Sequence, residues 1–270
     1  MPLLWLKVAT FFYGLGLVYA LLLLSSKGEK LSKIAGPAVT LGMVFHIVSL
    51  TESFLLEGHF DLASVHHSES LLAFLIVAIF MIFFIRYRTT SPGIFVFPLV
   101  FLLSLSSAIA QKPPYFTSSL LRSGWIFFHV AMIFTGYAAL FLSFAASLVY
   151  LVQANSLKNK QAVGFSRLPA LQVIDEIGYK ALILGFPFMT LGLVAGAVIA
   201  QEKFGPAYFI DPKVLLSLLM WGVYVVLLYT RWNSGWRGRK AAYLATFAFL
   251  AAIGAWAANY LSRVHRFSSL

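Results

Sequence analysis

The sequence predicts an all-α integral membrane bundle of about eight transmembrane helices, with both termini on the non-cytoplasmic side. Hydrophobic residues make up 60% of the 270 residues, charged residues 11%, and the mean hydropathy is +0.87, more than a water-soluble domain of this size needs. Eight apolar runs approach the ~20 residues that cross a bilayer as a helix. Thirteen of the 20 Lys and Arg residues fall in or beside the odd-numbered connections, which therefore face the cytoplasm.

We interpret the eight runs as a single polytopic membrane domain, residues 1–270. The first run could instead be a signal peptide, but no basic stretch precedes it and no small-residue cleavage site closes it. Because Lys and Arg report orientation in a membrane protein, the net charge of +11 does not indicate a nucleic-acid partner. The runs are 3–24, 32–55, 69–86, 93–110, 123–152, 178–200, 213–230 and 241–262.

The second run contains His46, about 4 Å along the helix axis from its midpoint. Ionisable groups at that depth usually face a cavity or a partner, so His46 is a candidate functional residue. The alternative is a neutral imidazole that is hydrogen-bonded to a neighbouring helix.

The connection to the third run holds three histidines, His59, His66 and His67, together with carboxylates. Such a cluster can bind zinc or another divalent ion, but no HxH or HExxH spacing supports a preformed site, and surface histidines explain it equally. We expect Glu69 to open the third helix, where a carboxylate complements the positive end of the helix dipole. That role needs no ligand.

The fifth run begins with Trp125 and His129, and His129 lies about 9 Å inside the outer end of its helix. This is the interfacial zone, where aromatic side chains also form belts. The connection 153–177 is polar and basic but too short for a catalytic domain. In the sixth run, Gly192 and Gly196 form a small-residue face for close helix packing.

The loop before the seventh run contains Tyr208, Phe209 and Asp211, and Trp221 follows within that run. Asp211 before Pro212 predicts a helix N-cap and first-turn pair. The next inner loop, 231–240, is basic and aromatic, which is typical of a membrane anchor.

The last run ends near His265, just outside the membrane on the side where His129 begins its helix. Two neutral imidazoles can supply both axial positions of a haem iron, and Arg122, Arg263 or Arg266 could pair with its propionates. The chain has no cysteine, which excludes thiolate metal sites, disulfides and covalent attachment of haem to this chain.

These residues make the chain similar to the cytochrome c assembly family of haem-handling membrane proteins, the CcsA/CcmC group, and particularly its HemX-like and YpjD-like branches. The likeness covers most of the chain. It is carried by His46, Gly58-His59, Glu69-Ser70-Leu71, Trp125 and His129 through Tyr137, Gly185–Ala197, Asp211-Pro212-Lys213 with Trp221, Thr230-Arg231, 235–239 and His265.

The resemblance implies a non-covalent b-type haem with His129 and His265 as axial iron ligands and the loop 204–211 as a platform. In the family this platform is rich in tryptophan, whereas here Tyr208, Phe209 and Ile210 stand before Asp211. An intramembrane histidine expected two residues before Arg231 is Tyr229, which puts a haem route through the membrane in doubt. The implied haem-contacting residues are His46, Trp125, His129, Tyr208, Phe209, Asp211, Trp221 and His265.

The leading functional hypothesis is a multi-pass protein of the bacterial inner or plasma membrane that presents haem on the outer side for cytochrome c maturation. Its partners would be apocytochrome c and a second assembly subunit. No acid/base or nucleophile motif is present, so catalysis, if any, would consist of positioning the haem for attachment. One alternative is a HemX-like membrane regulator of glutamyl-tRNA reductase and haem biosynthesis. Another is a small-solute transporter.

Overall fold

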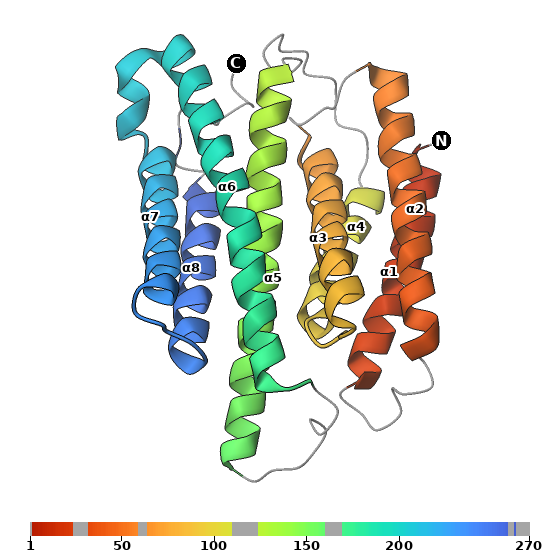
Figure 1. The fold of residues 1–270 in the computed structure, drawn as a ribbon. Helices are drawn as coiled ribbons and strands as arrows, with labels where there is room; N and C mark the ends of the chain where they lie inside the picture. Colours follow the sequence, from red (N-terminus) through yellow and green to blue (C-terminus); the bar gives the residue numbers. More distant parts are fainter. Residues whose placement is uncertain are drawn as a thin grey trace.

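The computed structural model describes residues 2–23, 32–58, 64–109, 124–159, 169–258 and 262, and within these ranges every regular element is a helix (Figure 1). The helices are α1 (Pro2–Leu23), α2 (Ser32–Glu57), α3 (Val65–Tyr87), α4 (Gly93–Ile109), α5 (Gly124–Lys158), α6 (Leu171–Phe204), the 3-10 helix η1 (Gly205–Ile210), α7 (Pro212–Trp232) and α8 (Arg239–Ala257).

The predicted all-α membrane bundle is confirmed. Within the described ranges, seven helices are long and apolar enough to cross a membrane, and α4 is a shorter apolar helix of 17 residues. At 1.5 Å per residue α4 is about 26 Å long, close to the thickness of a bilayer's hydrocarbon core. The orientation of the bundle in the membrane stays a prediction.

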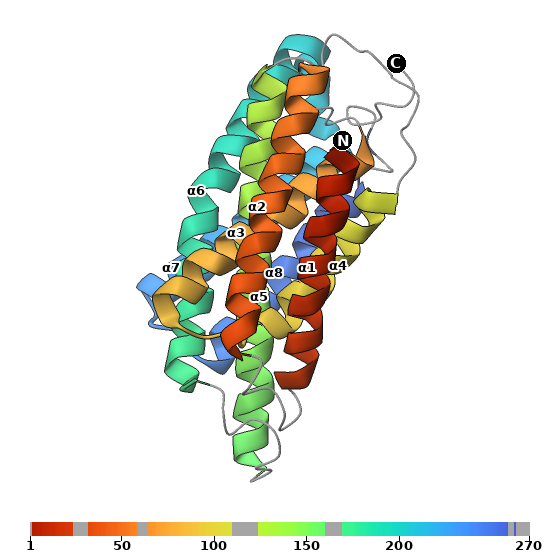
Figure 2. The ribbon, with the colours of Figure 1, turned by 90° about the vertical axis from the view of Figure 1, so that its right-hand side faces the viewer.

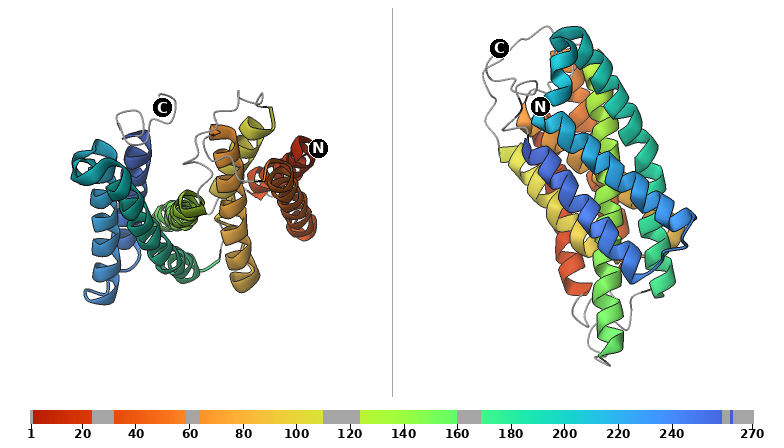
Figure 3. Two further views of the ribbon diagram at one scale, coloured as in Figure 1. Left: turned by 90° about the horizontal axis from the view of Figure 1, so that it is seen from above. Right: turned by 90° about the vertical axis from the view of Figure 1, so that its left-hand side faces the viewer.

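The helices form two groups, α1–α4 and α5–α8 (Figure 3). Within the second group, α5 lies on the side that faces the first group. In the first group α1 packs on both α2 and α4, as Figure 2 shows, and α3 packs on α4. In the second group α5 packs along α6 and α8, and α7 packs on α8. Contacts of α3 with α5 join the two groups.

Glycines bring α5 and α6 unusually close together. A Cβ at Gly185 would lie 2.7 Å from the Ala139 Cβ, and one at Gly192 would lie 2.7 Å from Ile133 Cγ1. Both distances are shorter than side-chain packing allows, so these positions admit only glycine without a shift of the neighbours. The prediction that Gly192 belongs to a close-packing helix face is confirmed.

Two expectations about helix limits need correction. The helices α5 and α6 run on to Lys158 and back to Leu171, beyond the predicted limits 152 and 178. A change from apolar to polar residues marks the end of a membrane span, whereas a helix that is already formed continues by adding one hydrogen bond per residue.

Glu69 does not open α3. This helix starts at Val65 after Ser64 in the N-cap position, and its first turn holds no acidic residue. Glu69 lies in the second turn, where the dipole effect has faded, and its carboxylate is 3.6 Å from His66 Nδ1.

Candidate functional site

The imidazole of His129 is held by one ring nitrogen only. Its Nδ1 lies 2.6 Å from the backbone carbonyl oxygen of Gly192 on α6. A carbonyl oxygen can only accept a hydrogen bond, so Nδ1 carries the proton and Nε2 keeps its lone pair. In the part of the chain that the structure describes, no hydrogen-bonding group meets Nε2. His129 therefore presents one neutral ring nitrogen that could bind a metal.

Gly196 leaves the space that the imidazole of His129 occupies. A Cβ at Gly196 would lie 2.5 Å from His129 Cε1 and 2.7 Å from Nδ1. Any side chain there would displace the ring from the Gly192 carbonyl. The glycine pair predicted to pack helices thus also positions the histidine, a role that the sequence pattern alone did not reveal.

The junction of η1 and α7 is organised by Asp211, which is buried. Its Oδ1 accepts a hydrogen bond from the Lys213 backbone N–H at 3.0 Å, which confirms the predicted N-cap. Its Oδ2 accepts a hydrogen bond from the Ser262 hydroxyl, also at 3.0 Å, so the chain beyond α8 is tied to the start of α7.

The aromatic candidates occupy different environments. Tyr208 is buried and its ring lies 4.2 Å from the ring of the exposed Phe209. Trp221 is engaged within the bundle, because its Nε1 donates to Thr190 Oγ1 at 3.0 Å. Trp125 is 69% exposed at the start of α5, near the same end as His129.

His46 lies in the other helix group and has no ring nitrogen to spare. Its Nδ1 is 3.2 Å from the Tyr13 hydroxyl, and its Nε2 is 2.8 Å from the Ser70 hydroxyl. The side chain is fully buried and its ring packs in a T-shaped arrangement with the ring of Phe74. This geometry corresponds to the hydrogen-bonded alternative considered from the sequence.

Several other candidates cannot be placed among the described residues. His265, His59, Arg122, Arg263 and Arg266 lie outside the described residues. Among the residues that are described, His66 and His67 included, no group of three or more metal-binding side chains is found.

Tyr229 is mostly exposed, and its hydroxyl accepts a hydrogen bond from Asn233.

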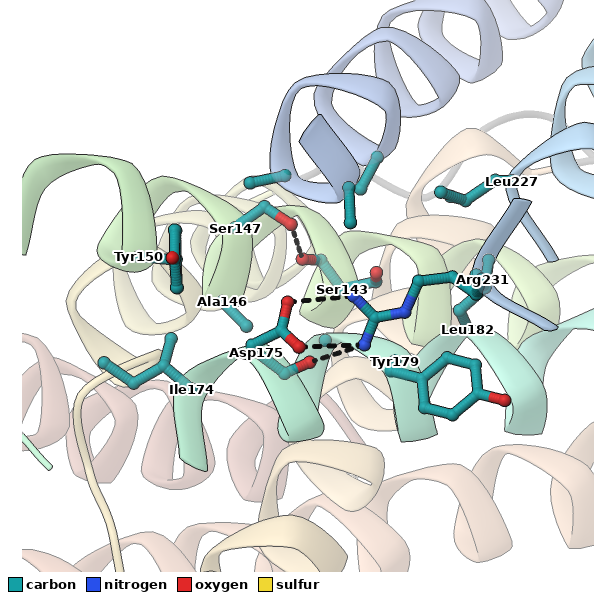
Figure 4. A pocket seen from close by; sticks show the side chains of 14 residues that line it. Ser143, Ala146, Ser147, Tyr150, Ile174, Asp175, Tyr179, Leu182, Leu227 and Arg231 are labelled. Atoms are coloured by element: carbon teal, nitrogen blue, oxygen red, sulfur yellow. Dashed lines mark hydrogen bonds and ion pairs between the residues drawn. The ribbon is translucent and has the colours of Figure 1, made fainter. Parts of the chain in front are cut away.

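The opposite end of α5–α8 holds an ion pair that sequence reasoning missed. Arg231 donates from Nη1 to Asp175 Oδ1 at 2.8 Å and from Nη2 to Oδ2 at 3.0 Å (Figure 4). The guanidinium also lies 4.5 Å from the ring centre of Tyr179. Asp175 further accepts the backbone N–H of Gly238 at 3.0 Å, so the loop 231–240 is fastened to α6. The signal for this pair was the acidic pair Asp175 and Glu176 in an otherwise basic connection.

Comparison with known proteins accounts for nearly the whole chain. A family model described as cytochrome C assembly protein matches residues 5–264. The chain belongs to the cytochrome c assembly protein family. The resemblance to this family drawn from the sequence is thereby confirmed, and family membership supports a role in cytochrome c biogenesis. The narrower likeness to the HemX-like and YpjD-like branches stays a prediction.

Curated relatives of this cytochrome c assembly family member carry the name cytochrome c biogenesis protein CcsA. The one from Chlamydomonas reinhardtii is 29% identical over 241 residues, which cover 85% of this chain and 67% of the relative. The one from Guillardia theta is 26% identical over 267 residues, covering 91% and 86%. The one from Heterosigma akashiwo is 30% identical over 230 residues, covering 70% of each chain.

Proposed function

We propose that this cytochrome c assembly family member binds one haem non-covalently and presents it on the outer face of the cell membrane for cytochrome c maturation. The observation that carries the proposal is the arrangement of His129, with Nδ1 committed to the Gly192 carbonyl and Nε2 left available. Metal-ligating histidines are typically oriented in this way by a second hydrogen bond. We further propose that residues 1–270 act as a single membrane domain.

The residues around His129 suit a haem. A neutral imidazole is a common axial ligand of haem iron, and porphyrin faces are covered by apolar and aromatic side chains. Trp125 and Phe128 stand beside His129 on α5 with edge-to-face rings 6.4 Å apart, and Phe209 offers exposed aromatic surface on η1. The absence of cysteine in the chain requires that the haem be held without a covalent bond.

His265 is the proposed second axial ligand. It follows three residues after Ser262, and Ser262 is bound to the Asp211 cap. Three residues of chain extend at most about 11 Å. The short spacing from the bound Ser262 supports the proposal, and His265 itself lies outside the described residues.

The chain's contribution would be to bind, orient and shield the haem. When bound, the haem would supply the iron and the vinyl groups that become attached to a partner apocytochrome. His129 would hold the iron, and the aromatic side chains would limit access of water to the porphyrin. Apocytochrome c and a second assembly subunit are the proposed partners.

The test is the absorption spectrum of the purified protein after loading with haem. We expect a Soret band that falls at least about tenfold in His129→Ala, because a lost axial ligand removes more than 1.4 kcal/mol of binding. Free imidazole added to His129→Gly should restore part of the band. His66→Ala, at the start of α3, is the matched control and should keep the band.

Two outcomes would contradict the proposal. One is a folded His129→Ala protein with an undiminished Soret band. The other is a wild-type protein that takes up no haem and whose deletion changes glutamyl-tRNA reductase abundance while c-type cytochromes remain intact. That second result would favour the HemX-like regulatory alternative.

A further inference from the structure

The loop 231–240 combines tryptophans with basic residues at a membrane boundary. Both α7 and α8 are long and apolar enough to cross a membrane, so the chain between them emerges at a membrane surface, at the end of the bundle away from His129 (Figure 1). The side chains of Trp232 and Trp236 are 68% and 37% exposed. Tryptophan favours the level of the lipid headgroups, so these rings hold the loop at that depth.

Hydrogen bonds give this loop a fixed conformation. The Trp236 backbone N–H donates to the Thr230 carbonyl at 3.1 Å, and the Gly238 N–H donates to Asp175 Oδ1 at 3.0 Å. Gly238 has a φ of 65°, which a residue with a side chain rarely adopts, and a Cβ there would lie 2.6 Å from the Tyr150 hydroxyl oxygen. The backbone positions of the charged residues on either side of Gly238 are therefore set by the fold.

Two of the four cations in this loop already have partners within the protein. Arg231 is held in its ion pair, and Arg239 donates from Nη2 to the Ala154 carbonyl at 3.0 Å. Arg237 and Lys240 are exposed, and within the described ranges neither is paired with a carboxylate. These two charges are available to a partner.

The surroundings of these two residues favour an anionic partner. The Lys240 ammonium group lies 5.6 Å from the ring centre of Trp236, a cation–π contact that keeps the charge beside the indole. At this end of the bundle the one exposed carboxylate among the described residues is that of Glu176, and it accepts a hydrogen bond from the Tyr87 hydroxyl. Further exposed cations at the same end are Arg86, Arg88, Lys158 and Lys180.

We propose that the loop 231–240 binds the phosphate group of an anionic phospholipid through Arg237 and Lys240. A guanidinium group donates to two phosphate oxygens at once, and an ammonium group adds a point charge. Trp232 and Trp236 hold both cations at the depth of the lipid phosphates, which gives a lipid an advantage over free phosphate. A zwitterionic headgroup brings its own cation, which this basic surface repels. The inference does not depend on haem binding.

The experiment titrates dioleoylphosphatidylglycerol, dioleoylphosphatidylcholine and inorganic phosphate separately into the purified protein in detergent. The melting temperature reports binding, because a ligand that binds the folded state raises it. Arg237→Gln with Lys240→Gln removes both charges, and Arg237→Lys with Lys240→Arg keeps them. The matched control, Lys7→Gln with Lys203→Gln, removes two exposed charges toward the other end of the bundle. Size-exclusion profiles without lipid establish that each variant is folded, and native mass spectrometry counts the phosphatidylglycerol retained.

We expect phosphatidylglycerol to raise the melting temperature of the wild type at concentrations at which phosphatidylcholine and inorganic phosphate have no effect. The variant without both charges should need about 25-fold more phosphatidylglycerol for the same shift, about fivefold for each charge removed. The charge-retaining variant and the control should stay within about twofold of the wild type. Added salt should weaken the effect by screening.

Three results would overturn the inference. If phosphatidylglycerol and phosphatidylcholine act equally on the wild type, the headgroup charge is not recognised. If the folded variant without both charges binds phosphatidylglycerol as the wild type does, or the control loses as much, Arg237 and Lys240 do not form the site. If inorganic phosphate stabilises the wild type as well as phosphatidylglycerol does, the ligand is a free anion and not a lipid.

Discussion

Each helix group contains a histidine within a candidate membrane-spanning helix, and the two histidines differ in their hydrogen bonds. In α1–α4, His46 is completely enclosed and both ring nitrogens meet side-chain hydroxyls, those of Tyr13 and Ser70. In α5–α8, His129 gives one nitrogen to a backbone carbonyl and keeps the other available. The two histidines therefore differ in the number of ring nitrogens that remain uncommitted.

The hydrogen-bond partners of the two histidines also differ in whether they select one tautomer of the imidazole. A hydroxyl can donate or accept a hydrogen bond, so the contacts of His46 are compatible with either neutral tautomer. The Gly192 carbonyl can only accept, so it selects one tautomer of His129. The α1–α4 group gains a cross-link between three helices, whereas α5–α8 gains a nitrogen of defined orientation.

The largest effect is expected for the ion pair between Arg231 and Asp175, which lies at the end of α5–α8 away from His129. The side chains of Arg231 and Asp175 are only 8% and 16% exposed, so Asp175→Ala would leave a buried cation without a partner. We expect a loss of about 3 kcal/mol in the free energy of unfolding, measured in detergent. The double variant Asp175→Leu with Arg231→Met should recover part of it. A loss below 1 kcal/mol would show that this ion pair does not hold the group together.

A smaller effect is expected in the other group. His46→Ala removes both hydrogen bonds at a fully buried position and should lower the free energy of unfolding by about 2 kcal/mol. Tyr13→Phe and Ser70→Ala should each cost about 0.6 kcal/mol. The haem absorbance per folded molecule should not change in any of the three. Loss of the Soret band from folded His46→Ala would break the comparison, because it would make His46 a ligand after all.

The smallest expected effect separates packing from positioning within α5–α8. A methyl group at Gly196 collides with the His129 ring, a side chain that can rotate away. Gly196→Ala should therefore weaken haem binding about tenfold, or 1.4 kcal/mol, with little change in the melting temperature. Gly222→Ala and Gly254→Ala are matched controls, because nothing lies within 4 Å of a Cβ at either position. Unchanged haem binding in Gly196→Ala would show that Gly196 does not position the His129 ring for haem.

Local sequence was enough to predict the helices, the Asp211 cap and the glycine face, because each depends on neighbouring residues in the chain. Partners across helices were not predictable. Gly192 is 63 residues from His129, and Asp175 is 56 residues from Arg231. In helices that are apolar on every side, hydrophobic periodicity does not report which face turns toward which neighbour. His129 could thus be singled out as a candidate ligand, while the carbonyl that orients it could not.

The hairpin of α7 and α8 is fastened at both of its ends, by Ser262 to Asp211 at one and by Gly238 to Asp175 at the other. Lys213 and Arg231 lie 18 residues apart on α7, about 27 Å along one continuous helix. Both ends of this helix are thus tied by hydrogen bonds, and Arg231 adds an ion pair with Asp175 at one of them. Because α7 is continuous, a tilt that separated Arg231 from Asp175 would also move the Asp211 cap at the opposite end of the helix.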